Sequence, residues 1–90
     1  MSVKIDIPYF LQYLTNDTEA AEVNGSTVGE CLEHLVKQFP GIKQLLFDKN
    51  GKLDMFGDIY VNGGSIYPEG LEKPVKDGDE LYIAILVGGG

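Results

Sequence analysis

The 90-residue sequence contains no arginine, one cysteine and one histidine, and these absences exclude several classes of function. Nucleic-acid recognition depends on basic patches and on bidentate arginine contacts, so nucleic acid is not an expected partner. A single cysteine, Cys31, excludes an intrachain disulfide and a zinc knuckle. Because His34 is also alone, no metal-binding constellation can be identified in the sequence.

Long apolar runs are missing as well. No stretch approaches the roughly 18 to 20 apolar residues that span a membrane, and the early Lys4 and Asp6 do not fit a signal peptide. We therefore expect a cytoplasmic protein without a membrane partner. The length suits one domain with a single modest core, and the 43% hydrophobic and 23% charged content is ordinary for a globular protein.

Negative charge is what the chain has in excess. Fourteen acidic residues against seven lysines give a net charge of −7. A protein with this balance is suited to docking on a basic protein surface, where charge raises the encounter rate more than the affinity. For most individual carboxylates, a role in solubility explains the charge at least as well.

The first quarter of the chain predicts two strands joined by a helical turn. Residues 3–9 alternate apolar and polar side chains with period two, which predicts a strand that ends near Pro8. We expect its inward side chains to be Val3, Ile5, Ile7 and Tyr9. Residues 10–14 predict a helical turn, and residues 18–23 a weaker second strand.

The clearest local signal is a helix that starts after Thr27. Residues 27–30 fit a capping box, in which the Thr27 hydroxyl accepts a first-turn N–H and Glu30 reaches back to the Thr27 N–H. Residues 40–41, a Pro-Gly pair, end the helix. Apolar residues at three- and four-residue spacing predict one buried stripe: Val28, Cys31, Leu32, Leu35, Val36 and Phe39. Cys31 lies on this stripe, which favours a small buried hydrophobe over a nucleophile, and His34 is expected on the solvent side.

The second half predicts a short helix over residues 42–47 and a strand over residues 53–61, with Ile59 and Val61 inward and Tyr60 outward. After a short irregular segment, a tight turn at Asp77-Gly78 leads into a final strand-like run. The pattern as a whole predicts an α+β roll, with a sheet of four or so strands packed against one capped helix.

The final run is followed by Gly88, Gly89 and Gly90. Glycine has no Cβ, so this tail can thread a channel where other side chains would clash. The Gly90 α-carboxylate is unhindered, and with an ordinary pKa of roughly 3.3 to 3.7 it is ionised at neutral pH. One interpretation is an acyl group that an ATP-using partner adenylates; the other is a frayed terminus or an expression remnant.

Several segments in the right order resemble the ubiquitin-like β-grasp sulfur carriers. They are the capping segment 27–30, Phe39-Pro40-Gly41, the turn over residues 48–53, residues 59–63, residues 76–81 and the terminal Gly89-Gly90. The family includes the small subunit of molybdopterin synthase (MoaD), the thiamine sulfur carrier (ThiS) and carriers for cysteine or methionine synthesis. The resemblance covers essentially the whole chain and implies a β-grasp domain over residues 1–87, in which a mixed sheet of four to five strands packs on one main helix. It also implies a flexible glycine tail over residues 88–90.

The resemblance also implies a chemistry for Gly90. In such carriers an E1-like activating enzyme uses ATP and Mg²⁺ to adenylate the terminal glycine, and a sulfur donor then displaces AMP to leave a thiocarboxylate. The carrier itself is not an enzyme and binds no cofactor. It delivers its sulfur to the large subunit of molybdopterin synthase or to another sulfur-accepting enzyme. Tethering supplies a high effective concentration for that transfer.

We expect the molybdopterin pathway first, with cysteine, homocysteine or thiamine biosynthesis as alternatives. An alternative of a different class is a non-catalytic β-grasp interaction domain with an inert tail. The family often has prolines before the diglycine, where this chain has Ile85-Leu86, and the lack of arginine in the tail argues against ubiquitin-type conjugation. An independent enzyme is not expected, because no nucleophile–base pair, carboxylate dyad or phosphate loop is readable.

Strand alternation predicts where a partner would dock. If Leu81, Ile83 and Ile85 face the core, the side chains that face solvent form an apolar strip leading to the tail: Pro8, Tyr60, Tyr82, Ala84 and Leu86. The alternative is a set of scattered surface residues. In the preceding turn, Asp77, Asp79 and Glu80 could pair with basic residues of the activating enzyme or simply be solvated.

Overall fold

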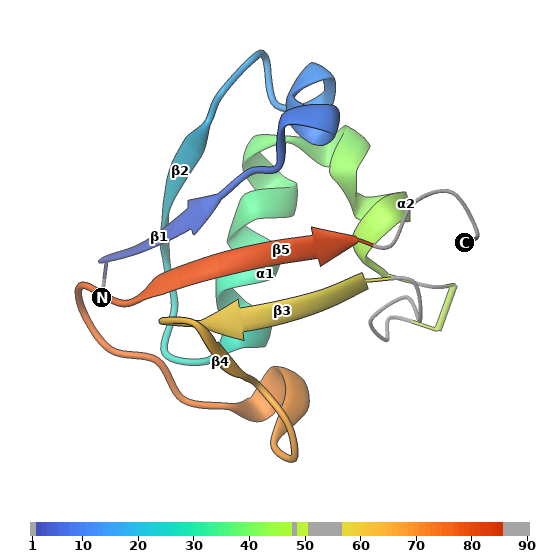
Figure 1. Ribbon diagram of the computed structural model, residues 1–90. Coiled ribbons are helices and arrows are strands. Elements are labelled where there is room, and N and C mark those ends of the chain that lie inside the picture. Colours follow the sequence, from blue (N-terminus) through green and yellow to red (C-terminus); the bar gives the residue numbers. More distant parts are fainter. Residues whose placement is uncertain (1, 48, 51–56, 86–90) are drawn as a thin grey trace.

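The computed structural model describes residues 2–47, 49–50 and 57–85. In this part of the chain, one face of a five-stranded sheet is covered by helix α1 (Figure 1). The strands are β1 (Ser2–Asp6), β2 (Ala20–Asn24), β3 (Gly57–Val61), β4 (Gly64–Ser65) and β5 (Glu80–Ile85). The helices are α1 (Val28–Gln38) and α2 (Lys43–Leu46), with 3-10 turns η1 (Tyr9–Leu14), η2 (Pro40–Ile42) and η3 (Gly70–Glu72). The order of the other four strands, η1 and the two α-helices is the predicted one, while β4 and η3 lie in the segment that was expected to be short and irregular.

The sheet is mixed, as predicted, and its order is β2-β1-β5-β3-β4. β1 pairs antiparallel with β2 and parallel with β5, and β3 pairs antiparallel with both β5 and β4. The parallel pair sets Lys4 opposite Glu80 and Asp6 opposite Tyr82. The first and last strands thus lie side by side at the centre of the sheet and run toward the same end.

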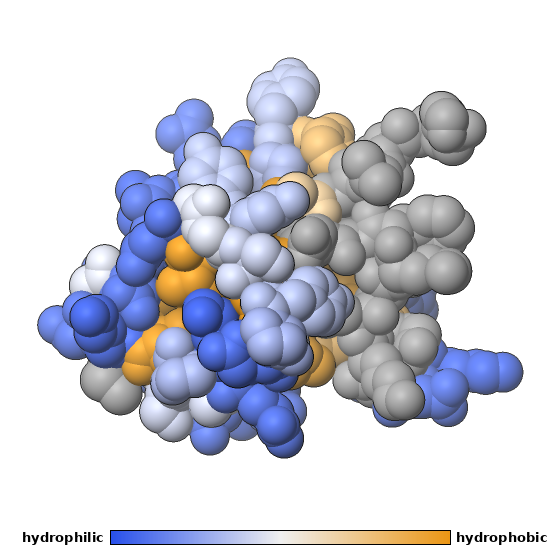
Figure 2. Space-filling model, turned by 60° about the horizontal axis from the view of Figure 1, so that its bottom comes forward, coloured by the Kyte–Doolittle hydropathy of each residue, from blue (hydrophilic) through white to orange (hydrophobic). Residues whose placement is uncertain are grey.

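The alternation in the strands separates a core face from a solvent face. Val3, Ile5 and Ile7 are buried, as predicted, and so are Ile59, Val61, Leu81 and Ile83. Residues 53–56, predicted as the start of the third strand, lie outside the described residues. Seen from another side, the surface is mostly hydrophilic, with apolar atoms visible between polar side chains (Figure 2).

Helix α1 begins and packs as its sequence predicts. The Thr27 hydroxyl accepts from the Glu30 N–H at 3.2 Å, and the buried stripe comprises Val28, Cys31, Leu32 and Leu35. The second half of the predicted capping box is wrong: the Glu30 carboxylate accepts from the N–H and hydroxyl of Ser26, both at 2.8 Å, and not from Thr27. These bonds lower the pKa of Glu30, since they stabilise its ionised form.

The prediction that Tyr9 continues the buried face of the first strand is also wrong. β1 ends at Asp6, and Tyr9 begins η1 with its side chain 88% exposed. The reason is Pro8, which caps η1 at its N-terminal end and has no N–H to donate to a ladder. The period of two therefore stops at Ile7.

Two polar side chains of α1 hold the neighbouring strand. The Asn24 N–H donates to Nδ1 of His34 at 2.7 Å, and Nε2 of Gln38 donates to the Glu22 carbonyl at 2.8 Å. His34 was expected only to face solvent. Both side chains supply partners to backbone groups of β2, whose outer edge has no strand beside it in the described sheet.

Candidate functional site

The predicted reactive position follows β5. Leu86, Gly88, Gly89 and Gly90 lie outside the described residues, so their predicted roles stay predictions. What the structure describes is the surface that leads to them: the outer face of the sheet, around the middle of β5.

Tyr82 is at the centre of this outer face. It is 55% exposed and pairs with Tyr60 across the antiparallel β3–β5 ladder and with Asp6 across the parallel β1–β5 ladder. Ala84, two residues further along β5, is also exposed, while Tyr60 is half-buried. The predicted outward orientation of Tyr82 and Ala84 is confirmed, and the structure brings Tyr60 and Tyr82 directly together.

Pro8 lies at the margin of this strip. It follows β1 by two residues, is half-buried, and precedes η1. Since Asp6 is in register with Tyr82, the chain around Pro8 leaves the sheet close to the level of Ala84. Four of the five predicted docking residues thus belong to adjacent strands or their ends, and the fifth, Leu86, is not described.

A charged group borders the strip on the opposite side of Tyr82 from Ala84. Lys4 Nζ lies 3.8 Å from an Asp6 oxygen and 3.9 Å from a Glu80 oxygen. The nearby Asp6 carboxyl group raises the pKa of Glu80, while the positive charge of Lys4 opposes this shift. These groups are partly exposed, so solvent screens their interaction.

In the acidic turn before β5, Asp79 has a structural role. Asp79 is buried, and its carboxylate accepts from the Lys76 N–H at 2.9 Å and from Nδ2 of Asn62 at 3.0 Å. These bonds lower the pKa of Asp79. The expectation that Asp79 either pairs with a partner or is solvated is therefore wrong. Its neighbour Asp77 accepts from the Ser2 N–H at 2.8 Å, which fastens the turn to β1.

Among the described residues, neither Cys31 nor a cluster of metal-binding side chains offers a reactive centre. Cys31 is fully buried, and burial raises the pKa of its thiol, so the thiolate that a nucleophile requires is disfavoured. Within residues 2–47, 49–50 and 57–85, no group of three or more His, Cys, Asp or Glu side chains is placed to hold a metal ion. The buried-hydrophobe interpretation of Cys31 is confirmed.

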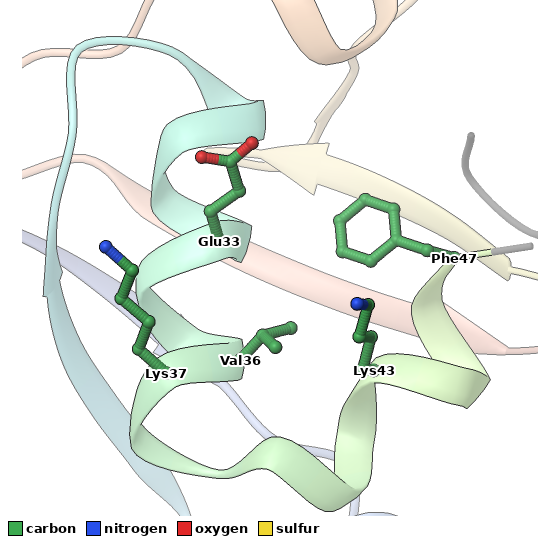
Figure 3. Close-up of a pocket in the computed structure, with 5 residues that line it drawn as sticks. All are labelled: Glu33, Val36, Lys37, Lys43 and Phe47. Atoms are coloured by element: carbon green, nitrogen blue, oxygen red, sulfur yellow. The ribbon is translucent and has the colours of Figure 1, made fainter. Parts of the chain in front are cut away.

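A surface hollow of about 320 Å³ lies between α1 and α2. In Figure 3, Val36 of α1 and Phe47 after α2 point toward the gap between the helices. Glu33, Lys37 and Lys43 also line it. The rim carries charges of both signs, so the described lining gives the hollow no strong preference for the charge of a ligand.

Sequence reasoning missed one exposed feature: the aromatic side chains of η1. Tyr9, Phe10 and Tyr13 are 88%, 45% and 73% exposed. The available signal was Pro8, because a strand that stops at a proline leaves the following aromatic residues without a core face.

The sheet order, the single main helix and the strip beside the last strand define a ubiquitin-like β-grasp fold of the kind that sulfur carriers share. The sequence matches the ThiS family over residues 7–90. The chain therefore belongs to the ThiS family.

Known relatives agree with this assignment over the whole chain. The sulfur carrier protein CysO of Mycobacterium tuberculosis is 33% identical over 93 aligned residues, which cover 100% of both chains. A chain in the crystal structure of the Amycolatopsis orientalis BexX/CysO complex is 37% identical, with a TM-score of 0.89 and coverage of 98% of this chain and 99% of that one. The protein is accordingly a small sulfur carrier, not a catalyst by itself.

A more distant likeness shows the fold alone. A putative molybdopterin converting factor subunit 1 from Pyrococcus furiosus is 21% identical, with a TM-score of 0.74 and coverage of 97% of this chain and 99% of that chain. This identity is too low to transfer its pathway to the present chain.

Proposed function

We propose that this protein is a CysO-type carrier, whose Gly90 is converted to a thiocarboxylate that supplies sulfur for cysteine synthesis. The observation that carries the proposal is full-length similarity, at 33% identity, to a protein named as a sulfur carrier of this type. The molybdopterin pathway expected from the sequence moves behind it, because the likeness to a molybdopterin factor is at 21% identity.

A carboxylate has no good leaving group, and the proposed chemistry supplies one. The Gly90 carboxylate is a poor acyl donor until one of its oxygens attacks the α-phosphorus of ATP, which releases pyrophosphate and leaves an acyl-adenylate. Sulfide then attacks the acyl carbon, AMP leaves, and a proton is released as the thiocarboxylate forms. In this scheme Gly88 and Gly89 are the tail that reaches the partner's active site.

The described surface supports docking for both steps. Tyr82 and Ala84 present exposed carbon on the strand that leads to the tail. The net charge of −7 favours enzymes with basic surfaces. The partners in the proposal are an E1-like activating enzyme that uses ATP and Mg²⁺, a sulfur donor, and a sulfur-accepting enzyme that makes cysteine.

The first test is intact mass spectrometry after incubation with ATP, Mg²⁺, sulfide and a candidate activating enzyme. Replacement of one oxygen by sulfur adds about 16 Da, as this acyl-transfer chemistry requires, and the gain must map to the C-terminal peptide. The matched control lacks Gly89 and Gly90, and we expect it to fold normally and gain nothing. No gain by the full chain with several activating enzymes would instead favour an interaction domain with an inert tail.

A second test separates the pathways. The thiocarboxylated protein is given either to an enzyme that replaces the leaving group of an activated serine with sulfur, or to a molybdopterin synthase large subunit with its precursor. In the first reaction, we expect the thiocarboxylate sulfur to displace the leaving group, which joins cysteine to the Gly90 acyl carbon. Hydrolysis of that acyl bond by water then releases cysteine and the unmodified carrier. Sulfur transfer only in the second would return the molybdopterin assignment to first place.

A further inference from the structure

The exposed aromatic side chains of this protein are concentrated on η1. Among the described residues, large hydrophobic side chains are exposed at five positions, and three of these, Tyr9, Phe10 and Tyr13, lie within one six-residue turn. Such a concentration of exposed aromatic carbon is uncommon on a monomer surface and typical of a docking site.

The geometry of η1 explains why these rings are exposed. A 3-10 helix has three residues per turn, so Leu11 and Leu14 lie on one side of it, and Phe10 and Tyr13 on another. Leu11 is buried and Leu14 packs against the core. The side of η1 that anchors the turn is therefore already occupied by leucine.

Hydrogen bonds to neighbouring backbone carbonyls also hold η1 in place, so the backbone that carries its aromatic side chains is well defined. The Leu11 N–H donates to the Pro8 carbonyl at 2.9 Å, and Nε2 of Gln12 donates to the Ile7 carbonyl at 3.1 Å. After η1, the Asp17 N–H returns to the Gln12 carbonyl at 2.8 Å. A fixed backbone lowers the ordering cost that binding would otherwise carry.

The three exposed aromatic residues of η1 line a hollow beside the negative charge of Asp17. Its volume is about 290 Å³, and it is lined by Tyr9, Phe10, Gln12, Tyr13 and Asp17. No lysine or arginine occurs from residue 5 to residue 36, a segment with several acidic side chains: Asp6, Asp17, Glu19, Glu22, Glu30 and Glu33. Aromatic rings beside a carboxylate form an environment that attracts a cationic side chain through both cation–π and ionic contacts.

The hollow lies toward the end of the sheet at which β5 ends. β1 and β5 are parallel neighbours, and η1 follows β1 beyond its C-terminal end, as Figure 1 shows. Because β5 runs toward that same end, an enzyme that receives the C-terminal residues and covers Tyr82 and Ala84 is brought close to η1.

We propose that this hollow is a second docking surface, which takes a lysine or arginine side chain of the enzyme that activates Gly90. The inference rests on the proposed function and adds to it a specificity-determining contact outside the sheet. Tyr9 and Tyr13 supply ring carbon for the cation and its alkyl stem, and Asp17 supplies the opposite charge.

The test uses the full-length protein and an activating enzyme that thiocarboxylates it. Initial rates of thiocarboxylate formation are measured against carrier concentration for the wild type, the double variant Tyr9→Ser/Tyr13→Ser, and Asp17→Asn. Tyr67→Ser is the matched control, since Tyr67 is 58% exposed and lies after β4, the strand at the far edge of the sheet from β2. Asn tolerates the positive φ of 61° at position 17, so Asp17→Asn keeps the turn.

We expect the KM of the double variant to rise about tenfold or more, with kcat within about twofold of wild type, because a binding contact is lost and the chemistry is not. Asp17→Asn should raise KM less and weaken the dependence of kcat/KM on salt. Tyr67→Ser should match the wild type. If the double variant fails to fold, as judged by circular dichroism, Asp17→Asn and its salt dependence decide the question.

Other results would overturn the inference. An unchanged KM in folded variants would show that the hollow does not contact the activating enzyme. Concentration-dependent self-association of the wild type that the tyrosine substitutions abolish would identify a second copy as the occupant instead. A wild type that no activating enzyme modifies would overturn the proposed function and, with it, this inference.

Discussion

Helix α1 and the turn η1 carry comparable apolar residues and place them in opposite environments. α1 buries Val28, Leu32 and Leu35 completely, whereas η1 buries Leu11 and leaves Tyr9 and Tyr13 largely in water. α1 has 11 residues at 3.6 per turn, so a repeated apolar stripe can follow the sheet. η1 has six residues, which allow only one row of side chains to face the core.

The comparison shows that the hydrophobicity of a segment does not by itself define its role. The exposure of its apolar side chains decides whether they stabilise the fold or are available to a partner. The apolar residues of α1 stabilise the domain against unfolding. Those of η1 beyond Leu11 and Leu14 contribute little to that stability, and their carbon surface is available to a partner. Substitutions in the two elements should therefore separate stability from activation.

The largest expected effect is in α1. Leu32→Ala removes a side chain with no exposed area from the centre of the stripe, which should lower the free energy of unfolding by about 2 to 5 kcal/mol. Urea denaturation measures the change. Glu33→Ala, one residue later and exposed, is the control and should shift stability by about 0.5 kcal/mol or less. Equal losses for the two variants would contradict the burial assigned to this face.

Within η1, Leu11→Ala should show that the anchoring side of the turn behaves like α1. Leu11 is 3% exposed, and its truncation should cost about 2 kcal/mol, the lower end of the range for buried leucine, because a short turn can relax into the space. Urea denaturation again gives the value. A loss below about 0.5 kcal/mol would mean that packing of Leu11 against the core contributes little to the stability of the protein.

The helix cap is the next smaller contribution. Thr27→Ala removes the hydroxyl that accepts the Glu30 N–H at 3.2 Å and should destabilise the protein by about 1 kcal/mol. Thermal unfolding of Thr27→Ser, which retains a hydroxyl, supplies the control and should lie close to wild type. If Ser and Ala at this position were equally destabilising, the methyl group and not the cap would carry the effect.

The sequence predicts α1 so well because its start, period and end are all local signals. Thr27, the three- and four-residue spacing and Pro40-Gly41 lie within a few residues of one another. The alternation in β5 is equally local, and it correctly predicts Tyr82 and Ala84 as exposed. Local periodicity was therefore sufficient to predict a sheet packed on one main helix and the exposure of Tyr82 and Ala84, while the docking role of these side chains stays a prediction.

The features that could not be predicted depend on contacts between distant residues. The Asp77 carboxylate accepts from the N–H of Ser2, which lies 75 positions earlier in the sequence. Asp79 is buried, and its carboxylate accepts from Nδ2 of Asn62. His34 looks like a surface residue until β2 brings the Asn24 N–H within 2.7 Å of it. In each case, tertiary contact gave a polar side chain a structural partner that the local pattern does not contain.

The pathway, likewise, was not predictable from the residues. This chain has the fold of a CysO chain at 37% identity and also that of a putative molybdopterin converting factor subunit at 21% identity, so the fold does not separate the two pathways. The full-length relatives, not any motif, changed the order of the two alternatives.

A smaller and pH-dependent effect is expected at Glu30, next to the cap. Its pKa is lowered by the Ser26 N–H and hydroxyl, so its contribution to stability is fully present above its ordinary pKa of 4.5 and is lost as the pH falls through the lowered value. Glu30→Gln should therefore be less stable than wild type at pH 7, and the difference should shrink toward pH 3. Urea denaturation at several pH values tests this. A difference that is constant with pH would exclude the charge as its cause.

The smallest effect on stability should come from Tyr13→Ser. Tyr13 is 73% exposed, so the free energy of unfolding should change by about 0.5 kcal/mol or less, even though more side-chain carbon is removed than in Leu32→Ala. The same variant should raise the KM for the activating enzyme, which Leu32→Ala should not do under conditions where it remains folded. Urea denaturation measures the effect of each variant on the free energy of unfolding, and activation kinetics measure its effect on KM. Each of the two variants should change only one of these quantities. A Tyr13→Ser protein that lost stability like Leu32→Ala would show that η1 packs more of its aromatic surface than the structure indicates, and the contrast between the two elements would fail.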